Sequence, residues 1–259
     1  MSNNKLYLFV VFIFSSCLIS TEVAIVTKNN GSVKYKKENS KRFTNKINSG
    51  FELFNNDLLV TGNDGFIMFA YLDDGSLIKV HKDSEVIVDG NLNNKIINKQ
   101  VLINDGFIKF NIKKQKQNEF KIVTPTSVAS VKGTIFYIDT SSDGDVFYGF
   151  DGEVEVQNLA SNEISSLTQN KKLTSLQDGT MEIENIVEED IEYIVQVQQE
   201  SGIELDEIQE INDFEEQQPD INNQQGTGNV ETEEIQNVII TFTDENGQQK
   251  QIIIKFVEK

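Results

Sequence analysis

Short apolar runs separated by turn residues dominate the chain as far as residue 152. Turn signals of several kinds recur between these runs, and many of them are Asn-Gly or Asp-Gly pairs, which favour tight turns. They stand at Asn30-Gly31, Asp74-Gly75, Asp89-Gly90, Asp105-Gly106, Asp143-Gly144 and Asp151-Gly152. Asn30-Gly31, with an apolar run on each side, predicts a β-hairpin. Because regularly spaced short strands are typical of all-β folds, the pattern as a whole predicts a β-sandwich, barrel or solenoid.

The segment 123–139, VTPTSVASVKGTIFYID, is the most informative part of the sequence. Pro125 fixes its own φ angle and pushes Thr124 towards extended geometry, which indicates a turn before a strand. Gly133 then interrupts an apolar run and predicts a β-bulge or a close approach of two backbones. The segment pairs no nucleophile with a base. It therefore indicates a shape and a binding surface rather than a reaction.

Beyond Lys172 the spacing of apolar residues changes from that of strands to that of helices. Apolar residues at 183, 186, 187, 191, 194 and 195 predict an acidic amphipathic helix that ends near Ser201-Gly202. Leu205, Ile208 and Ile211 predict a second, shorter helix. We assign residues 181–215 to this helical segment and residues 216–235 to a polar linker.

The last residues, 236–259, predict a terminal β-hairpin. Val238–Thr243 and Gln251–Val257 are rich in β-branched residues and flank Asn246-Gly247. Since an isolated two-stranded hairpin is only marginally stable in water, we expect it to dock on the β body or on a partner.

The first twenty residues have the composition of an export signal. Lys5 precedes an apolar stretch from Leu6 to Ile19, which is shorter than the ~20 residues that span a bilayer. This predicts a cleaved signal peptide over residues 1–20 and an exported protein. Cys17 is the only cysteine, and Phe14-Ser15-Ser16-Cys17 resembles a bacterial lipobox in which Cys17 is lipidated. The alternative is a cysteine inside a discarded leader that is cut near Ser20 or Thr21.

Charge divides the chain into two parts. Residues 1–172 carry 20 basic and 19 acidic residues, whereas residues 173–249 carry 21 acidic residues and no lysine or arginine. An acidic surface repels phosphate backbones, so we expect no nucleic-acid partner. The acidic part has the composition of a solvated, partly disordered extension.

The sequence offers few candidates for chemistry. His81 is the only histidine, and its offset from Ile78 and Val80 predicts an exposed side chain without the partners of a triad or a metal site. Asp73-Asp74 and Asp143-Gly144-Asp145 lack the spacing of a calcium loop and are explained as turn residues. We therefore predict no catalytic residue, no metal site and no cofactor.

Five elements in order resemble the FecR domain of bacterial envelope proteins, over about residues 31–180. They are Leu58-Leu59-Val60-Thr61-Gly62, Asp74-Gly75-Ser76 with the strand after it, Gly106-Phe107-Ile108-Lys109-Phe110, Thr124-Pro125 with Val131-Lys132-Gly133-Thr134-Ile135-Phe136, and Gly152-Glu153-Val154-Glu155-Val156. The resemblance implies a twisted β-solenoid or sandwich over residues 22–180. It also makes Thr124, Pro125, Lys132, Gly133, Thr134 and Phe136 the residues of the family motif.

Lys132 stands where the FecR pattern has arginine. Lysine keeps the charge but loses the planar fork of five donors. From the residues alone, Lys132 is a strand lysine beside a glycine bulge.

Similarity to the best-studied FecR proteins implies an envelope sensor that relays receptor occupancy to a sigma factor. Those proteins place a cytoplasmic sigma-binding region and a membrane span before the FecR domain, and Met1 to Ser20 has no room for both. We therefore expect a non-catalytic protein of the periplasm or cell surface that binds a protein or an envelope polymer and meets a membrane only through Cys17. Two alternatives stay open. One is a component of trans-envelope signalling, and the other is a polysaccharide-active enzyme with paired carboxylates in a cleft.

Overall fold

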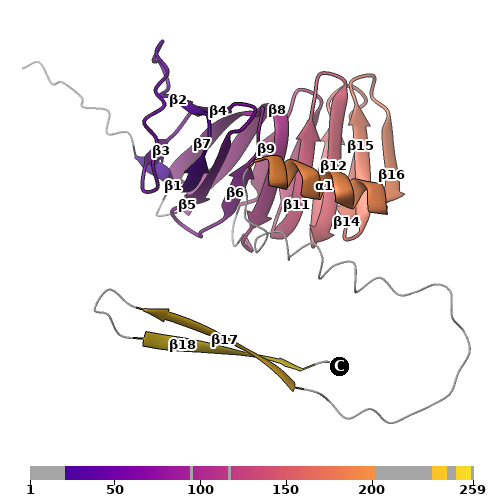
Figure 1. The fold of residues 1–259 in the computed structure, drawn as a ribbon. Coiled ribbons are helices and arrows are strands. Elements are labelled where there is room, and N and C mark those ends of the chain that lie inside the picture. Colours follow the sequence, from indigo (N-terminus) through magenta and orange to yellow (C-terminus); the bar gives the residue numbers. More distant parts are fainter. Residues whose placement is uncertain (1–20, 94–95, 116–117, 202–234, 244–248, 258–259) are drawn as a thin grey trace, which may run out of the picture. The chain divides into compact units, whose positions relative to one another are not determined.

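The computed structural model describes residues 21–93, 96–115, 118–201, 235–243 and 249–257. The chain divides into two units, residues 1–215 and residues 216–259. The described residues of the first unit form two β-sheets and one helix, and those of the second unit form two strands (Figure 1).

The first unit is a β-sandwich whose two sheets share one strand. Sheet A contains, in spatial order, β3 (Glu52–Phe54), β1 (Glu22–Asn30), β5 (Phe66–Tyr71), β6 (Leu77–Val80), the second half of β8 (Ile96–Ile112), β11 (Thr134–Thr140), β12 (Gly144–Asp151), β15 (Lys171–Leu176) and β16 (Met181–Asn185). Sheet B contains β2 (Val33–Lys36), β4 (Asp57–Thr61), β7 (Glu85–Asn93), the first half of β8, β9 (Phe120–Val123), β10 (Ser127–Val131), β13 (Glu153–Asn158) and β14 (Ile164–Thr168). Among the described strands of this unit, β8 and β9 pair in parallel and the other pairs are antiparallel.

Strand β8 passes from one sheet to the other. Its residues 96–105 pair with β7 in sheet B, and its residues 106–112 pair with β11 in sheet A. The change occurs at Gly106, which has a φ of +112° and leaves no room for a side chain because Ser84 packs against it. A glycine tolerates this conformation, so the strand can bend without breaking.

The core lies between the two sheets and follows the alternation of side chains along each strand. In β8, Val101 and Ile103 face the core from sheet B, and Ile108 and Phe110 face it from sheet A. The rings of Phe110 and Phe136 stack with their centroids 5.0 Å apart. The predicted all-β body is therefore confirmed, and it is a sandwich of two continuous sheets.

Several turn predictions need correction. The hairpin predicted at Asn30-Gly31 is wrong, because β1 pairs with β3 and β5 whereas β2 pairs with β4. Asp89-Gly90 and Asp105-Gly106 lie inside β7 and β8. Hairpins do form at Asp74-Gly75 and Asp143-Gly144. The same residues that close hairpins also let a chain bend or cross between layers, and local sequence does not separate these uses.

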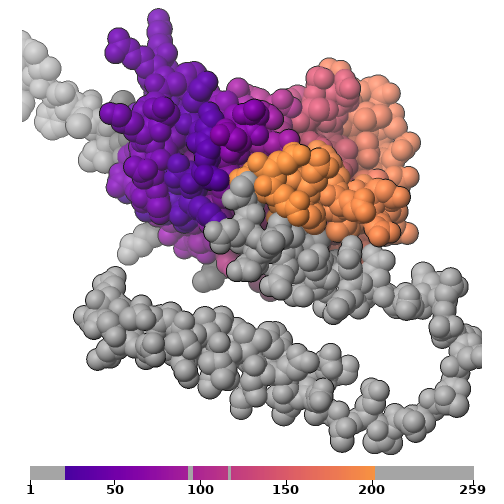
Figure 2. All heavy atoms as spheres, viewed as in Figure 1, coloured from indigo at the N-terminus to yellow at the C-terminus, as the bar shows by residue number. Residues whose placement is uncertain are grey.

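Helix α1 (Glu188–Glu200) lies across the outer face of sheet A (Figures 1 and 2). The predicted helical segment began too early, because Met181–Asn185 pair with β15 as strand β16. The helix starts where the side chain of Asp190 accepts a 3.0 Å hydrogen bond from the Val187 N–H. It packs on an aromatic patch that is separate from the main core.

The second unit contains β17 (Ile235–Thr243) and β18 (Gln249–Val257), which pair antiparallel along their whole length. The terminal hairpin is therefore present, with strands longer than predicted. The predicted leader with Cys17, the second helix at 205–211, the linker as far as 234 and the Asn246-Gly247 turn lie outside the described residues.

Candidate functional site

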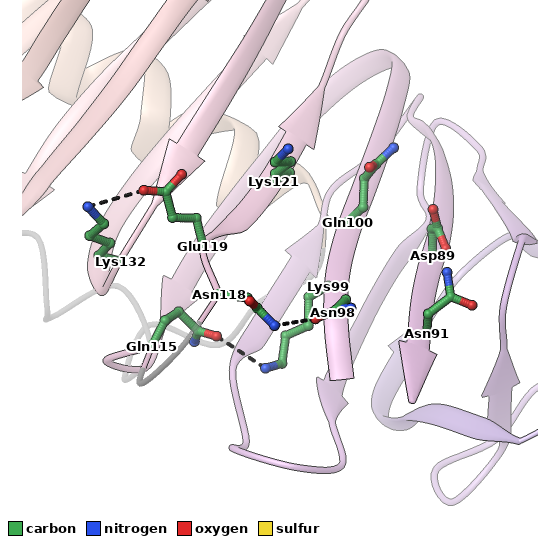
Figure 3. Close-up of a pocket in the computed structure, with 10 residues that line it drawn as sticks. All are labelled: Asp89, Asn91, Asn98, Lys99, Gln100, Gln115, Asn118, Glu119, Lys121 and Lys132. Atoms are coloured by element: carbon green, nitrogen blue, oxygen red, sulfur yellow. Dashed lines mark hydrogen bonds and ion pairs between the residues drawn. The ribbon is translucent and has the colours of Figure 1, made fainter. Parts of the chain in front are cut away.

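A polar groove of about 810 Å³ crosses the outer face of sheet B (Figure 3). Strands β7, β8 and β9 form its base, and the segments after β8 and β10 border it. The residues that line it are Asp89, Asn91, Asn98, Lys99, Gln100, Gln115, Asn118, Glu119, Lys121 and Lys132. Of these described residues, five carry amides, three are lysines and two are carboxylates.

Strand register arranges the lining side chains in two rows. Asp89 pairs with Gln100, and Gln100 pairs with Lys121, so these three residues follow one another across three strands. Asn91 pairs with Asn98 in the next row. Because neighbouring strands lie about 4.8 Å apart, each row presents polar groups at a regular short spacing.

Two contacts join lining residues of neighbouring segments. The Asn118 amide donates to the Oδ1 atom of Asn98 (Figure 3). Lys132 forms an ion pair with Glu119, with 3.1 Å between Nζ and Oε1. The side chain of Lys132 is 78% exposed, so this ion pair is weakly stabilising and open to exchange.

Lys99 forms a buried ionic cluster at one end of the groove. Its side chain is only 2% exposed, and its Nζ lies 2.8 Å from Asp73 and 2.9 Å from Asp74. The same ammonium donates a 3.2 Å hydrogen bond to Gln115. Burial raises the pKa of Asp74, but hydrogen bonds from Lys99, Ser76 and Gln115 outweigh it and hold this pKa below its usual value. Lys99 is therefore a fixed structural cation.

The base of the groove is tied to the opposite sheet. The Tyr71 hydroxyl donates to the backbone carbonyls of Asp89 at 2.9 Å and of Gln100 at 3.1 Å. Asn55 accepts a 2.9 Å hydrogen bond from the Gly90 N–H. Burial is the main cause that raises the pKa of Asp89 above its usual value. These contacts fix the backbone beneath Asp89 and Gln100, so the groove is preorganised.

The lining has the chemistry of a hydrogen-bonding surface. Each amide side chain offers both donors and an acceptor, and each lysine or carboxylate adds a charged partner. Along the first row, a carboxylate that accepts, an amide that can accept and donate, and an ammonium that donates follow one another. Such an arrangement can bind a ligand that carries many hydroxyl or amide groups.

The family-motif residues separate in the structure. Lys132 lines the groove, in the turn between β10 and β11 rather than in a strand. Thr124 and Pro125 lie at the other end of β10, where Thr124 Oγ1 donates a 2.5 Å hydrogen bond to buried Asp145. Thr126 donates to the same carboxyl group. The Thr-Pro-Thr turn of sheet B is thus attached to β12 of sheet A.

The remaining motif residues have structural positions. A side chain on Gly133 would approach the Lys114 Cα atom to 2.9 Å, and Gly133 has a φ of +147°. This is a close backbone approach of the kind that the sequence predicted. Thr134 is buried, and Phe136 stacks on Phe110 in the core.

The predicted exposure of His81 is wrong. Its side chain is fully buried between the rings of Phe66 and Phe107. His81 does lie off the core-facing side of β6, but α1 covers that face, and the Ser201 hydroxyl lies 3.3 Å from Nδ1. Burial lowers the pKa of His81 to about 3, with further lowering from Lys79 and Lys109. The pattern of residues around His81 could not predict this burial, because α1 is distant from His81 in the sequence.

Sequence reasoning missed the groove except for Lys132. Its other lining residues are polar residues of β7, β8, β9 and the segment after β8, and they carry no motif. Within the residues that the structure describes, histidine, cysteine and carboxylate side chains form no group that could hold a metal ion. No helix of the described residues is long and apolar enough to cross a membrane.

Comparison with known proteins finds a family model that matches part of the chain. Residues 57–155 match the FecR family, described as FecR protein. Two crystal structures of a protein from Parabacteroides distasonis ATCC 8503, assigned as an anti-sigma factor, are similar at 15% identity with a TM-score of 0.46. The similarity covers 54% of this chain and 64% of that protein. Among curated proteins, none matches the chain by sequence.

Proposed function

Because residues 57–155 belong to the FecR family, we propose that this chain is an exported, non-catalytic envelope protein that binds an envelope polymer through the groove on sheet B. The observation that carries the proposal is the preorganised polar groove with its two rows of side chains. A protein is the other class of partner that the groove could bind.

The lining of the groove favours a hydroxyl-rich polymer over a protein. Protein interfaces are usually centred on aromatic or other large apolar side chains, and the described lining residues include none. Amide side chains instead match the paired donor and acceptor roles of hydroxyl and N-acetyl groups. The lining residues also extend across the three neighbouring strands β7, β8 and β9, which suits a chain-like ligand (Figure 3).

Calorimetric titration tests this proposal. The receptor is the intact full chain. The two probes are an N-acetylglucosamine hexasaccharide and dextran, which is a neutral glucan. Replacing Asn98 and Gln100 together with alanine should weaken glycan binding at least about tenfold, because two hydrogen-bonding side chains are lost. Gln157→Ala is the matched control, since Gln157 lies on the outer face of sheet B but outside the groove. No binding of either glycan, or equal binding by the variant, would contradict the proposal and favour a protein partner.

A second candidate function is a relay in trans-envelope signalling, which the FecR match favours. In this case the hairpin of β17 and β18 would pair with an edge strand of a membrane partner by β-augmentation. Deleting residues 238–259 should abolish capture of that partner from envelope extracts while the first unit keeps its thermal transition. Unchanged capture would exclude this use of the hairpin.

A further inference from the structure

The outer face of sheet A carries an apolar surface that is separate from the core of the sandwich. Phe107, Tyr137, Tyr148 and Phe150 form this surface, and Ile194 and Val197 of α1 cover it. Phe107 and Tyr193 meet edge to face at 5.7 Å. Because the core cluster lies on the other face of the same strands, this surface can be covered or uncovered without opening the core.

Basic residues border the aromatic surface where the two ends of α1 lie. Lys172 contacts Asp190 near the start of the helix, at 3.0 Å. Lys82 contacts Glu200 at the other end. Between them, Lys109 lies over the Tyr137 ring at 5.3 Å. The helix itself has five acidic and no basic residues over 188–200. The surface is therefore complementary to an acidic helix with one apolar face.

The contact between α1 and the sheet leaves two buried polar atoms without hydrogen bonds. Among the described residues, His81 Nε2 and Gln198 Oε1 are buried and find no hydrogen-bond partner. A buried polar atom without a hydrogen-bond partner lowers the stability of the contact, whereas a wholly apolar contact has no such cost. The contact is thus weaker than its apolar area alone would make it.

From these observations we propose that the outer face of sheet A is a binding surface for an acidic amphipathic helix of another protein, and that α1 is its reversible resting cover. Charge complementarity and the aromatic centre define the partner, because any replacement must satisfy Lys82, Lys172 and the ring of Phe107.

Hydrogen exchange on the intact wild-type chain is the first test. The amides of Ile194 and Val197 should exchange through a local opening, at least about tenfold faster than the most protected amides of β8 and β11. If these helix amides exchange only together with the sheet core, α1 is a permanent part of the fold and the proposal is wrong.

Peptide binding is the second test, and it needs no unfolding. The probe is a labelled synthetic peptide with the sequence of residues 186–201, and a scrambled peptide is its control. The pair Asp190→Asn and Glu200→Gln loosens α1 but keeps every residue of the receiving surface. It should bind the probe roughly threefold to tenfold more tightly than wild type, because the open population rises. Glu192→Gln makes the same kind of change at an exposed position of α1 and should leave binding unchanged.

Three results would overturn the proposal. The loosened variant could bind the probe no better than wild type, or the scrambled peptide could bind equally well. The loosened variant could also dimerise by exchanging α1, which would make a second copy of the chain the occupant. Adding Lys82→Gln and Lys172→Gln to the loosened variant should reduce probe binding again, and unchanged binding would exclude the lysines as part of the surface.

Discussion

The imidazole of His81 and the hydroxyl of Ser201 are 3.3 Å apart, although 120 residues separate them in the sequence. Ser201 also donates a 2.9 Å hydrogen bond to the Val197 carbonyl and accepts one of 3.2 Å from the Lys82 N–H. This one hydroxyl group therefore connects the end of α1 to the end of β6. The contact places the buried histidine beneath the end of α1.

Acid should destabilise the protein through His81. Its pKa is about 3 in the folded protein, against 6.5 as its ordinary value. The unfolded chain therefore binds an extra proton between these values, and the stability that neutral His81 contributes is lost as pH falls from about 6.5 towards 3. Urea unfolding at pH 7 and pH 5 should show a larger loss for wild type than for His81→Gln. Equal losses in both proteins would mean that His81 titrates normally in the fold.

The Thr-Pro-Thr turn should contribute to stability through Asp145. Thr124→Val removes a 2.5 Å hydrogen bond to a carboxyl group that is fully buried. We expect the free energy of unfolding to fall by about 1–3 kcal/mol. Ser142→Ala, at an exposed position, should change it by less than about 0.5 kcal/mol. Urea denaturation of both variants measures the difference, and equal values would show that the Thr124 contact is not stabilising.

Gly133 should tolerate alanine less well than Gly50. Both glycines have positive φ angles, but a Cβ at Gly133 would meet the Lys114 backbone at 2.9 Å, whereas the space around Gly50 is open. Backbone strain at either site costs about 1 kcal/mol, and the overlap at Gly133 should add about 1–2 kcal/mol. Thermal unfolding of the two alanine variants compares them directly. A Gly50→Ala variant that is the less stable of the two would refute the steric explanation.

Two of the three lysines that line the groove, Lys99 and Lys132, should differ sharply in how much they stabilise the fold. Lys99→Met leaves Asp73 and Asp74 without their buried cation and should lower the free energy of unfolding by about 3–5 kcal/mol. Lys132→Met removes a surface ion pair with Glu119 and should cost less than about 1 kcal/mol. Guanidinium denaturation gives both values. Similar costs for the two variants would show that burial does not determine the strength of these ion pairs.

The sequence was sufficient for the fold class, because the core strands follow the apolar alternation and β5 and β6 meet at a predictable Asp-Gly turn. The sequence was not sufficient to predict which strands belong to which of the two sheets. Asn30-Gly31 has the residues of a hairpin but connects strands of opposite sheets, and Gly106 bends a strand that continues in the second sheet. These differences depend on which strands pair at long range, and local turn chemistry carries no such information.

The candidate site was predictable only in part. Lys132 was identified through the family motif, but its neighbours in the groove come from β7, β8 and β9 and join only through strand register. The burial of His81 could not be predicted either, since it requires the position of α1 on sheet A. The family motif mainly marks structural contacts, such as Thr124 with Asp145 and Phe136 with Phe110.

The most direct test of the central claim is a hydrogen-exchange footprint of the full chain, with and without purified envelope polysaccharide. Binding in the groove predicts slower exchange at residues 98–100 and 119–121 and unchanged exchange in β13 and β14 of the same sheet. Slower exchange confined to other surfaces, or none at saturating polysaccharide, would contradict the assignment of this groove as the binding site.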